Sequence, residues 1–424
     1  MIYIAYPETK VGGEIKRTAA NDPEKEKLVA AIMNDIRARG DVALVEYTRK
    51  FDSVELNEFL VSSSELEAAI KNVSNELKSA IELAKSNIEK FHALQKSAIV
   101  EIETMPGVKC WRKNIPIEKV GLYIPGGSAP LFSTILMLAV PAKLAGCREI
   151  ILCTPPSKDG SVNAAILYTA QLCGVTKIFK VGGAQAIAAM AYGTETIPRV
   201  DKIFGPGNSF VTCAKQLISK DGIAIDIPAG PSELAVYADN SVPAEFIAAD
   251  LLSQCEHGKD SQVVFVTCDK EMIEKVRNAV DSQLENLPRK EIAIEALKNS
   301  FMFLMKNEDE AMQLLNDYAP EHLILACANA RELAERAVNA GSVFLGAWSP
   351  ESVGDYASGT NHTLPTNGAA RAWSGVSLDS FVKKVTFQEL TKEGLKNIGP
   401  AVEVMAEAEG LFAHKNAVTI RLKK

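Results

Sequence analysis

The sequence predicts an α/β protein with two parallel sheets in succession. From about residue 118 to 373, short runs of β-branched and other apolar residues alternate with longer helical stretches. These runs are apolar on both faces, as expected of parallel strands that helices cover on each side. The length of 424 residues also leaves room for about two to four structural units.

The alternation falls into two series. The first has strand candidates Val120–Ile124, Glu149–Cys153, Lys177–Val181 and Lys202–Phe204, with helices expected at 130–147, 162–173, 184–193 and 208–220. The second has strand candidates Leu234–Tyr237, Val263–Val266, Phe301–Met305, Leu323–Ala326 and Val343–Leu345, with helices at 243–256, 271–285, 308–317 and 330–340. No sequence repeat relates the two series.

The flanking regions have a different pattern. Near the start, Asn21-Asp22-Pro23 and Gly40 bracket an amphipathic helix over 24–39, and residues 63–97 predict one or two further helices. The tail after 373 predicts a helix near 399–409 and a final strand over Val418–Leu422. Because the tail has little apolar surface of its own, we expect it to pack on another domain or another subunit.

Composition and charge exclude several classes of protein. The chain has 46 Lys and Arg against 53 Asp and Glu, a net charge of −7, which argues against a nucleic-acid partner. The best candidate for a membrane span, Ile135–Val140, ends at Pro141, and no apolar run approaches the ~20 residues that a span requires, so we expect none. The eight cysteines include no C-x-x-C pair, and several lie inside apolar runs. Free thiols and the lack of a signal-like N-terminus predict a cytoplasmic protein.

Three glycine turns follow strands of the first series: Pro125-Gly126-Gly127, Gly182-Gly183 and Gly205-Pro206-Gly207. The carboxyl ends of parallel strands share one edge, where helix N-termini bind anions such as pyrophosphate. Tight turns require glycine whatever they bind, however, and the dinucleotide pattern G-x-G-x-x-G is absent from all three. The turns therefore allow a nucleotide site without identifying the nucleotide.

The chain has only five histidines, and four of them have an acid or amide nearby. His92 lies in a charged helix, where we expect it to have a structural role. The other pairs are Gln254 with His257, Glu321 with His322, Asp355 with His362, and Glu409 with His414. Imidazole and carboxylate together can bind a divalent metal or transfer protons near neutral pH. No H-x-x-x-H or cysteine zinc pattern occurs, so a metal site would join distant segments, and the residues by themselves leave metal dependence open.

Several longer motifs resemble those of histidinol dehydrogenases. They are Ile225-Asp226-Ile227-Pro228-Ala229-Gly230-Pro231-Ser232-Glu233, Gln254-Cys255-Glu256-His257, Val120-Gly121-Leu122-Tyr123-Ile124-Pro125-Gly126-Gly127, Gly205-Pro206-Gly207-Asn208, Ala319-Pro320-Glu321-His322, Gly354-Asp355-Tyr356 and Asn361-His362-Thr363-Leu364-Pro365. They occur in the family's order, from about residue 20 to His414. Cys255 is a departure, because the family pattern has Ala there.

The resemblance implies a fold of two incomplete Rossmann-like, aldehyde-dehydrogenase-like parallel-sheet domains, with a helical N-terminal region and a small C-terminal tail. The implied parts are an N-terminal arm (1–20), a first α/β domain (21–117 plus 233–373), a second α/β domain on the NAD⁺ side (118–232) and a tail (374–424). The tail of this family packs on the partner subunit of a homodimer, so that the active site is shared.

The resemblance also implies an activity, the last step of L-histidine biosynthesis. L-histidinol would be oxidised through L-histidinal to L-histidine, with reduction of two NAD⁺ and one Zn²⁺ per subunit. The implied zinc ligands are Gln254, His257, Asp355 and His414, and the implied acid/base pair is Glu321 and His322. The implied substrate contacts are Ser232, Gln254, His257, His322, Asp355, His362, Glu409 and His414. The implied NAD⁺ contacts are Tyr123, Gln185 and Asn208.

Two other functions remain as alternatives. One is a homologous NAD-dependent dehydrogenase of another alcohol, such as a sulfonated diol, although the chain keeps all four histidines of the implied site. The other is a zinc hydrolase, which would leave the three glycine turns without a role. A binding protein without catalytic activity fits the acid–histidine pairs least.

Overall fold

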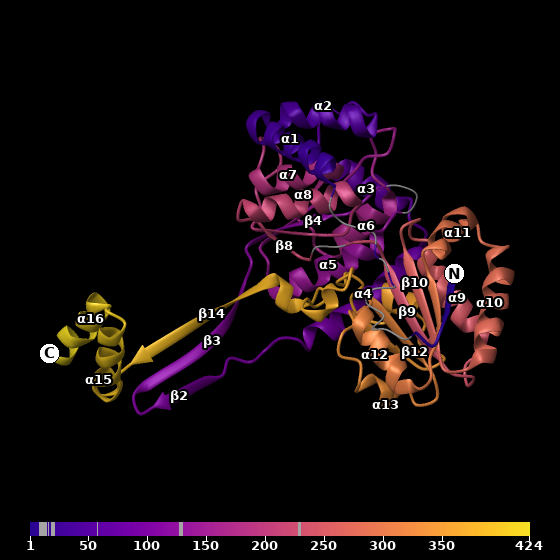
Figure 1. Ribbon diagram of the computed structural model, residues 1–424. Helices are drawn as coiled ribbons and strands as arrows, with labels where there is room; N and C mark the ends of the chain where they lie inside the picture. Colours follow the sequence, from indigo (N-terminus) through magenta and orange to yellow (C-terminus); the bar gives the residue numbers. More distant parts are fainter. Residues whose placement is uncertain (8–14, 16, 18–21, 57, 127–129, 228–229) are drawn as a thin grey trace.

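The computed structural model describes residues 1–7, 15, 17, 22–56, 58–126, 130–227 and 230–424. Two α/β units lie next to each other, and an arm reaches away from them to carry the C-terminus at its tip (Figure 1). Gly127 of the first glycine turn, Pro228 and Ala229 of the longest motif, and most of the predicted N-terminal arm lie outside the described residues.

The first unit is built on a five-stranded parallel sheet with strand order β6-β5-β4-β7-β8. Its strands are β4 (Lys119–Tyr123), β5 (Glu149–Thr154), β6 (Lys177–Lys180), β7 (Lys202–Phe204) and β8 (Ala224–Ile225). Its helices are α5 (Phe132–Ala145), α6 (Ala164–Leu172), α7 (Gly183–Tyr192) and α8 (Ser209–Lys220). The strands and helices predicted for the first series are confirmed, and the short β8 is an addition.

The second unit is built on a six-stranded parallel sheet with strand order β1-β11-β10-β9-β12-β13. Its strands are β1 (Ile2–Ala5), β9 (Glu233–Ala238), β10 (Gln262–Thr267), β11 (Phe301–Leu304), β12 (His322–Ala326) and β13 (Ser342–Leu345). Its helices are α9 (Ala244–Cys255), α10 (Lys270–Leu284), α11 (Lys290–Lys298), α12 (Glu308–Tyr318), α13 (Ala330–Ala334) and α14 (Glu351–Tyr356). The strand β1, at the N-terminus, was not predicted, and α13 is shorter than the expected helix over 330–340.

Both sheets share one topology. Counted along the chain from β4 or from β9, five strands of each unit lie in the order 3-2-1-4-5, and in the second unit β1 adds a further strand beside β11. This is the Rossmann order without its sixth strand. The prediction of two incomplete Rossmann-like sheets is therefore confirmed, although the sequences of the two units show no repeat.

The N-terminal helices complete the core of the first unit. They are α1 (Pro23–Arg39), α2 (Asp41–Asp52), α3 (Ser63–Lys71) and α4 (Asn75–Ala93). Val29, Ile32 and Ile36 of α1 are buried together with Ile187 of α7. Ile81 and Ile88 of α4 are buried in another cluster with residues of α5. This packing differs from the predicted grouping of 21–117 with 233–373, because the apolar faces of these helices cover the sheet of residues 118–232.

The arm combines two distant parts of the chain. An antiparallel sheet in the order β14-β3-β2 joins β2 (Glu101–Met105) and β3 (Val108–Pro116) to β14 (Val382–Leu390), and α15 (Lys392–Ala408) and α16 (Phe412–Leu422) follow. Short 3₁₀ helices at Ala369–Arg371 and Leu378–Phe381 precede β14. The prediction of a strand over Val418–Leu422 is wrong. Val418 and Leu422 lie on one face of α16, where a Cβ at Gly399 of α15 would be 3.1 and 3.0 Å from their side chains.

In the described part of the chain, no helix combines the length and the apolar character that a membrane crossing requires. All eight cysteines are free thiols, and Cys255 is fully buried beside Gln254.

Candidate active site

A cluster of buried acidic and imidazole side chains lies at the amino edge of the second sheet. Glu233 begins β9 and His322 begins β12, and these neighbouring strands bring both residues to the same edge. Glu321 comes immediately before β12, after a sharp turn in which Ala319 takes a left-handed conformation with φ of +50°. Pro320 then prevents continuation of α12. The exposed fractions of Glu233, Glu321 and His322 are 3%, 7% and 3%.

The imidazole of His322 lies among three carboxyl groups. Its Nδ1 is 3.7 Å from Glu321 Oε2 and 3.8 Å from Glu351 Oε1, and its Nε2 is 3.3 Å from Asp355 Oδ1. Glu351 and Asp355 both come from the short helix α14. The backbone of Glu233 connects His322 to Glu321. Its carbonyl oxygen is 3.3 Å from His322 Nδ1, and its N–H donates to Glu321 Oε2 at 2.9 Å.

Burial and mutual attraction shift the protonation of this cluster. Burial alone would lower the pKa of His322, but Glu351, Glu321 and Asp355 together raise it to about 10. Burial raises the pKa of Glu321 to about 8 and that of Glu351 to about 8, although the charge of His322 opposes both shifts. The cluster therefore holds protons near neutral pH that its members can exchange, as acid/base catalysis requires.

A group of side chains with the ligand atoms for a metal ion overlaps this cluster. One ligand atom from each of His257, Glu351 and Asp355 lies within 4.8 Å of the others. Gln254 is buried beside them, and with its amide turned to satisfy both groups it donates to Glu351 and accepts from the N–H of Glu233 at 3.1 Å. One imidazole with carboxylate and amide oxygens suits a borderline metal such as zinc.

Three of the four predicted zinc ligands, Gln254, His257 and Asp355, are thus brought together. Glu351 was not predicted from the sequence. Its exposed fraction is 2%, but in the sequence it is one of many acids, without a neighbouring histidine or a motif to single it out.

The loop that contains His362 connects this cluster to the first unit. His362 Nδ1 donates to the backbone oxygen of Asp355 at 2.8 Å, and its Nε2 is 3.1 Å from Thr134 Oγ1 of α5. Asn361 donates to the backbone oxygen of Met137, also in α5, at 2.6 Å. Both ring nitrogens of His362 therefore contact protein groups, so the side chain joins Asp355 to the other unit.

The remaining predicted substrate contacts lie in two places. Ser232 immediately precedes Glu233 and is half-buried at the edge of the cluster. Glu409 follows α15 and His414 lies in α16, so both are at the tip of the arm, where both are exposed (Figure 1). Within one chain they are not brought to the cluster.

The three predicted NAD⁺ contacts share the carboxyl edge of the first sheet. Tyr123 ends β4, Gln185 lies in the first turn of α7, and Asn208 caps α8 by accepting from two backbone N–H groups at 3.0 and 3.1 Å. The Tyr123 hydroxyl accepts from the N–H of Gly183 at 3.0 Å, which joins the end of β4 to the second glycine turn. The contact of Thr134 with His362 places this edge next to the amino edge of the second sheet.

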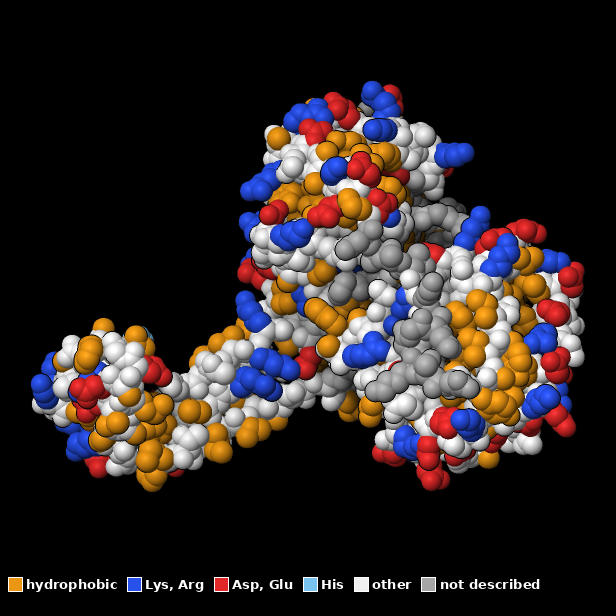
Figure 2. Space-filling model, viewed as in Figure 1, with side chains coloured by type: hydrophobic (Ala, Val, Ile, Leu, Met, Phe, Trp, Pro, Cys, Tyr) orange, Lys and Arg blue, Asp and Glu red, His pale blue; other side chains and the backbone are white. Residues whose placement is uncertain are grey.

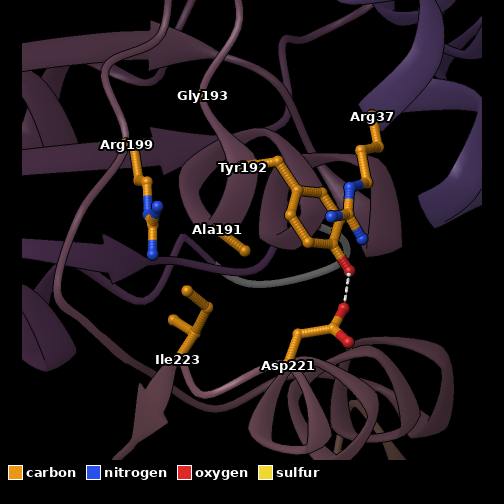
Figure 3. Close-up of a pocket in the computed structure, with 7 residues that line it drawn as sticks. All are labelled: Arg37, Ala191, Tyr192, Gly193, Arg199, Asp221 and Ile223. Carbon is orange, nitrogen blue, oxygen red and sulfur yellow. Dashed lines mark hydrogen bonds between the residues drawn. The ribbon is translucent and has the colours of Figure 1, made fainter.

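A separate cavity of about 310 Å³ lies elsewhere in the first unit (Figure 3). It is at the C-terminal end of α7, away from Gln185, and is lined by Arg37, Ala191, Tyr192, Gly193, Arg199, Asp221 and Ile223. The guanidinium of Arg37 lies 5.3 Å from the centre of the Tyr192 ring, and the Tyr192 hydroxyl donates to Asp221 at 2.7 Å. This cavity contains none of the predicted site residues.

Comparison with known proteins shows the family of the chain. The family model of histidinol dehydrogenase matches residues 15–422. The chain belongs to the histidinol dehydrogenase family. It is 59% identical over 423 residues to the histidinol dehydrogenase of Bacteroides thetaiotaomicron, covering 100% of this chain and 99% of the relative. It is 53% identical over 398 residues to that of Escherichia coli, covering 93% and 91%.

A solved structure of the histidinol dehydrogenase family is also similar throughout. The crystal structure of histidinol dehydrogenase from Elizabethkingia anophelis matches with a TM-score of 0.98 at 55% identity, covering 100% of this chain and 98% of that one. The resemblance found in the sequence motifs is thereby confirmed.

Proposed function

We propose that the chain is a zinc-dependent enzyme that oxidises L-histidinol through L-histidinal to L-histidine, with reduction of two NAD⁺. The observation that carries the proposal is the placement of His322 and Glu321 among buried carboxyl groups, beside the edge that bears Tyr123, Gln185 and Asn208. Membership of the histidinol dehydrogenase family supports the same substrate.

The side chains divide between metal binding and proton transfer. Gln254, His257 and Asp355 would hold the zinc ion, and Glu351 lies close enough to take part. When bound, the ion would orient the imidazole and amine of the substrate and offset the negative charge that raises the pKa of His322.

His322 would accept the hydroxyl proton as hydride leaves the alcohol carbon for NAD⁺. After His322 has released this proton to solvent, Glu321 would take a proton from the water that adds to the aldehyde in the second half-reaction. His322 would then take the remaining hydroxyl proton of the hydrate as the second hydride leaves for NAD⁺. Burial of both side chains keeps competing water away from the aldehyde between the two steps.

The arm supports a homodimer with shared sites. The chain exposes 20907 Å², whereas a compact monomer of 45.8 kDa would expose about 16,000 Å². The excess of about 5,000 Å² per chain leaves ample room for an obligate dimer interface, which buries about 2,000–5,000 Å² or more over both partners together. Hydrophobic side chains gather on the arm and its tip (Figure 2), and Val404, Met405 and Phe412 are 66%, 65% and 63% exposed. We propose that this tip packs on a second copy and that Glu409 and His414 of the partner subunit join the cluster.

An activity assay tests the proposed function. L-histidinol and NAD⁺ should give about two NADH per histidinol oxidised, a chelator should abolish the reaction, and added Zn²⁺ should restore it. A sulfonated diol in place of L-histidinol should give no NADH. Failure to form NADH from L-histidinol with zinc present would contradict the proposal.

Mixing two inactive variants tests the shared site. In a dimer of one His414→Ala chain and one Glu321→Ala chain, one of the two sites keeps both residues if the arm crosses between subunits. Random exchange makes half of the dimers mixed, so activity should recover to roughly a quarter of the wild-type value. If each site lies within one chain, the mixture will stay inactive.

A further inference from the structure

A buried ion pair lies beneath the third glycine turn. Lys215 of α8 pairs with Asp226, which directly follows β8, and their side chains are 3% and 1% exposed. Both groups also bind Gly205. The Lys215 ammonium donates to the carbonyl oxygen of Gly205 at 2.9 Å, and the Gly205 N–H donates to Asp226 Oδ2 at 2.8 Å. The pair thus fixes Gly205 through both of its backbone polar groups.

Gly205 in turn packs directly on the end of β4. Its φ is +124°, a conformation that L side chains rarely adopt, and a Cβ at this position would collide with the carbonyl oxygen of Tyr123. Asn208, which caps α8, lies on the same turn. The position of Gly205 therefore sets the distance between Tyr123 and Asn208, which are two of the three predicted NAD⁺ contacts.

Stability alone does not account for this arrangement. Two charges taken out of water lose hydration, and well-packed apolar residues of similar size often stabilise a core as well as a buried ion pair does. Apolar residues, however, cannot provide the hydrogen-bond donor and the acceptor that Lys215 and Asp226 direct at the backbone of Gly205. Asp226 also belongs to the longest sequence motif, yet the proposed reaction gives it no part.

We infer that Lys215 and Asp226 are a positioning pair for the NAD⁺ site, because they hold Gly205 so that Tyr123 and Asn208 stay at the spacing the dinucleotide requires. The inference rests on the proposed function, since it assumes that NAD⁺ binds at this edge. Among the described residues, neither member of the pair has a hydrogen bond or ion pair with the zinc cluster or the proposed substrate contacts, so only the affinity for NAD⁺ and NADH should depend on it.

Two double variants separate positioning from folding. K215M/D226L removes both bonds to Gly205 without leaving a lone buried charge. K215M/D226N removes the donor but keeps an acceptor for the Gly205 N–H. NADH affinity is measured by fluorescence titration, together with zinc content, the KM for L-histidinol and the unfolding midpoint. NADH binding should weaken about threefold in K215M/D226N and about tenfold in K215M/D226L. The KM for NAD⁺ should rise in parallel, with kcat at saturating NAD⁺ and the KM for L-histidinol unchanged.

The possible outcomes are distinct. If the wild-type protein does not bind NADH, the proposed function fails, and this inference fails with it. If the wild-type protein binds NADH and K215M/D226L binds it equally well, the inference alone is overturned. A loss of zinc or a higher KM for L-histidinol that accompanies weaker NADH binding would also overturn it, because that pattern marks general disruption. If K215M/D226L does not fold, unchanged NADH affinity in K215M/D226N overturns the inference.

Discussion

Replacing Arg17 by Met removes the partner of a buried carboxyl group. Arg17 Nε is 2.8 Å from Glu233 Oε1, and the two side chains are 19% and 4% exposed. The guanidinium also lies 4.3 Å from the centre of the Tyr318 ring. Burial raises the pKa of Glu233 to about 7, although the charge of Arg17 lowers it. Without Arg17, we expect this pKa to rise further.

The cost of the R17M substitution should therefore depend on pH. Removing one partner of a buried ion pair costs about 3–5 kcal/mol when the other stays charged. A carboxyl group whose pKa is raised in the folded state stabilises that state at low pH, and this contribution is lost as pH rises through the folded pKa. At pH 6, Glu233 should be protonated and need no charged partner. The free energy of unfolding should then fall by only about 1 kcal/mol, which comes from the remaining contacts of Arg17. At pH 8.5, where Glu233 would have to ionise without a partner, we expect a loss of about 3 kcal/mol.

Urea unfolding at a fixed protein concentration measures this difference. Chelator-treated wild-type protein, R17M, E233Q and the double variant would be compared at pH 6 and pH 8.5. The coupling energy between the two positions should be large at pH 8.5 and close to zero at pH 6. An R17M loss of the same size at both pH values would refute the reasoning, because it would mean that Glu233 does not change its protonation.

Four further predictions concern the cluster and the core. His322→Ala should lower kcat about 10²- to 10⁴-fold with zinc content unchanged, whereas His257→Ala should lose zinc by metal analysis. Glu351→Gln should weaken zinc affinity about 10- to 100-fold in a competition titration, and unchanged affinity would exclude Glu351 from the metal group. The metal-free protein should lose stability from about pH 4.5 to pH 8 in urea titrations, since burial raises the pKa of Glu321 and Glu351 to about 8. Phe381→Ala should cost about 3–5 kcal/mol of unfolding free energy, because Phe381 is fully buried against Phe204.

Most of the two parallel sheets was predictable from the sequence because their strands are continuous apolar runs. The predicted strand Lys202–Phe204 coincides with β7, and Val120–Ile124 differs from β4 by one residue at each end. The arm was not predictable in the same way. The strands β3 and β14 pair over their whole length but are largely half-buried or exposed, so their residues lack the apolar pattern of a core strand.

The tail shows how packing overrides local preference. Val418 and Ile420 favour a strand, yet the chain is helical there because Val418 and Leu422, one turn apart, fit against the bare backbone of Gly399. No feature of the tail sequence by itself predicts that contact.

The site was predictable where a residue lies in a long motif, as Glu321 and His322 do. Glu351 was not, because its importance comes from burial next to His322, and burial of one acid among 53 acidic residues leaves no trace in the sequence. The cluster's place at the amino edge of the second sheet was equally hidden, since the glycine turns directed attention to the carboxyl edge of the first.

The two units have the same strand order but meet through opposite edges, the carboxyl edge of one against the amino edge of the other. Such a head-to-tail contact cannot be symmetric, so the two sheets cannot supply equivalent ligand sites to the space between them. Only the first sheet turns its carboxyl edge, the proposed dinucleotide edge, toward that space. Under the proposed function, each chain should therefore bind a single dinucleotide despite its two Rossmann-like sheets. The two proposed hydride transfers would then require release of the first reduced cofactor and entry of a second at the same place.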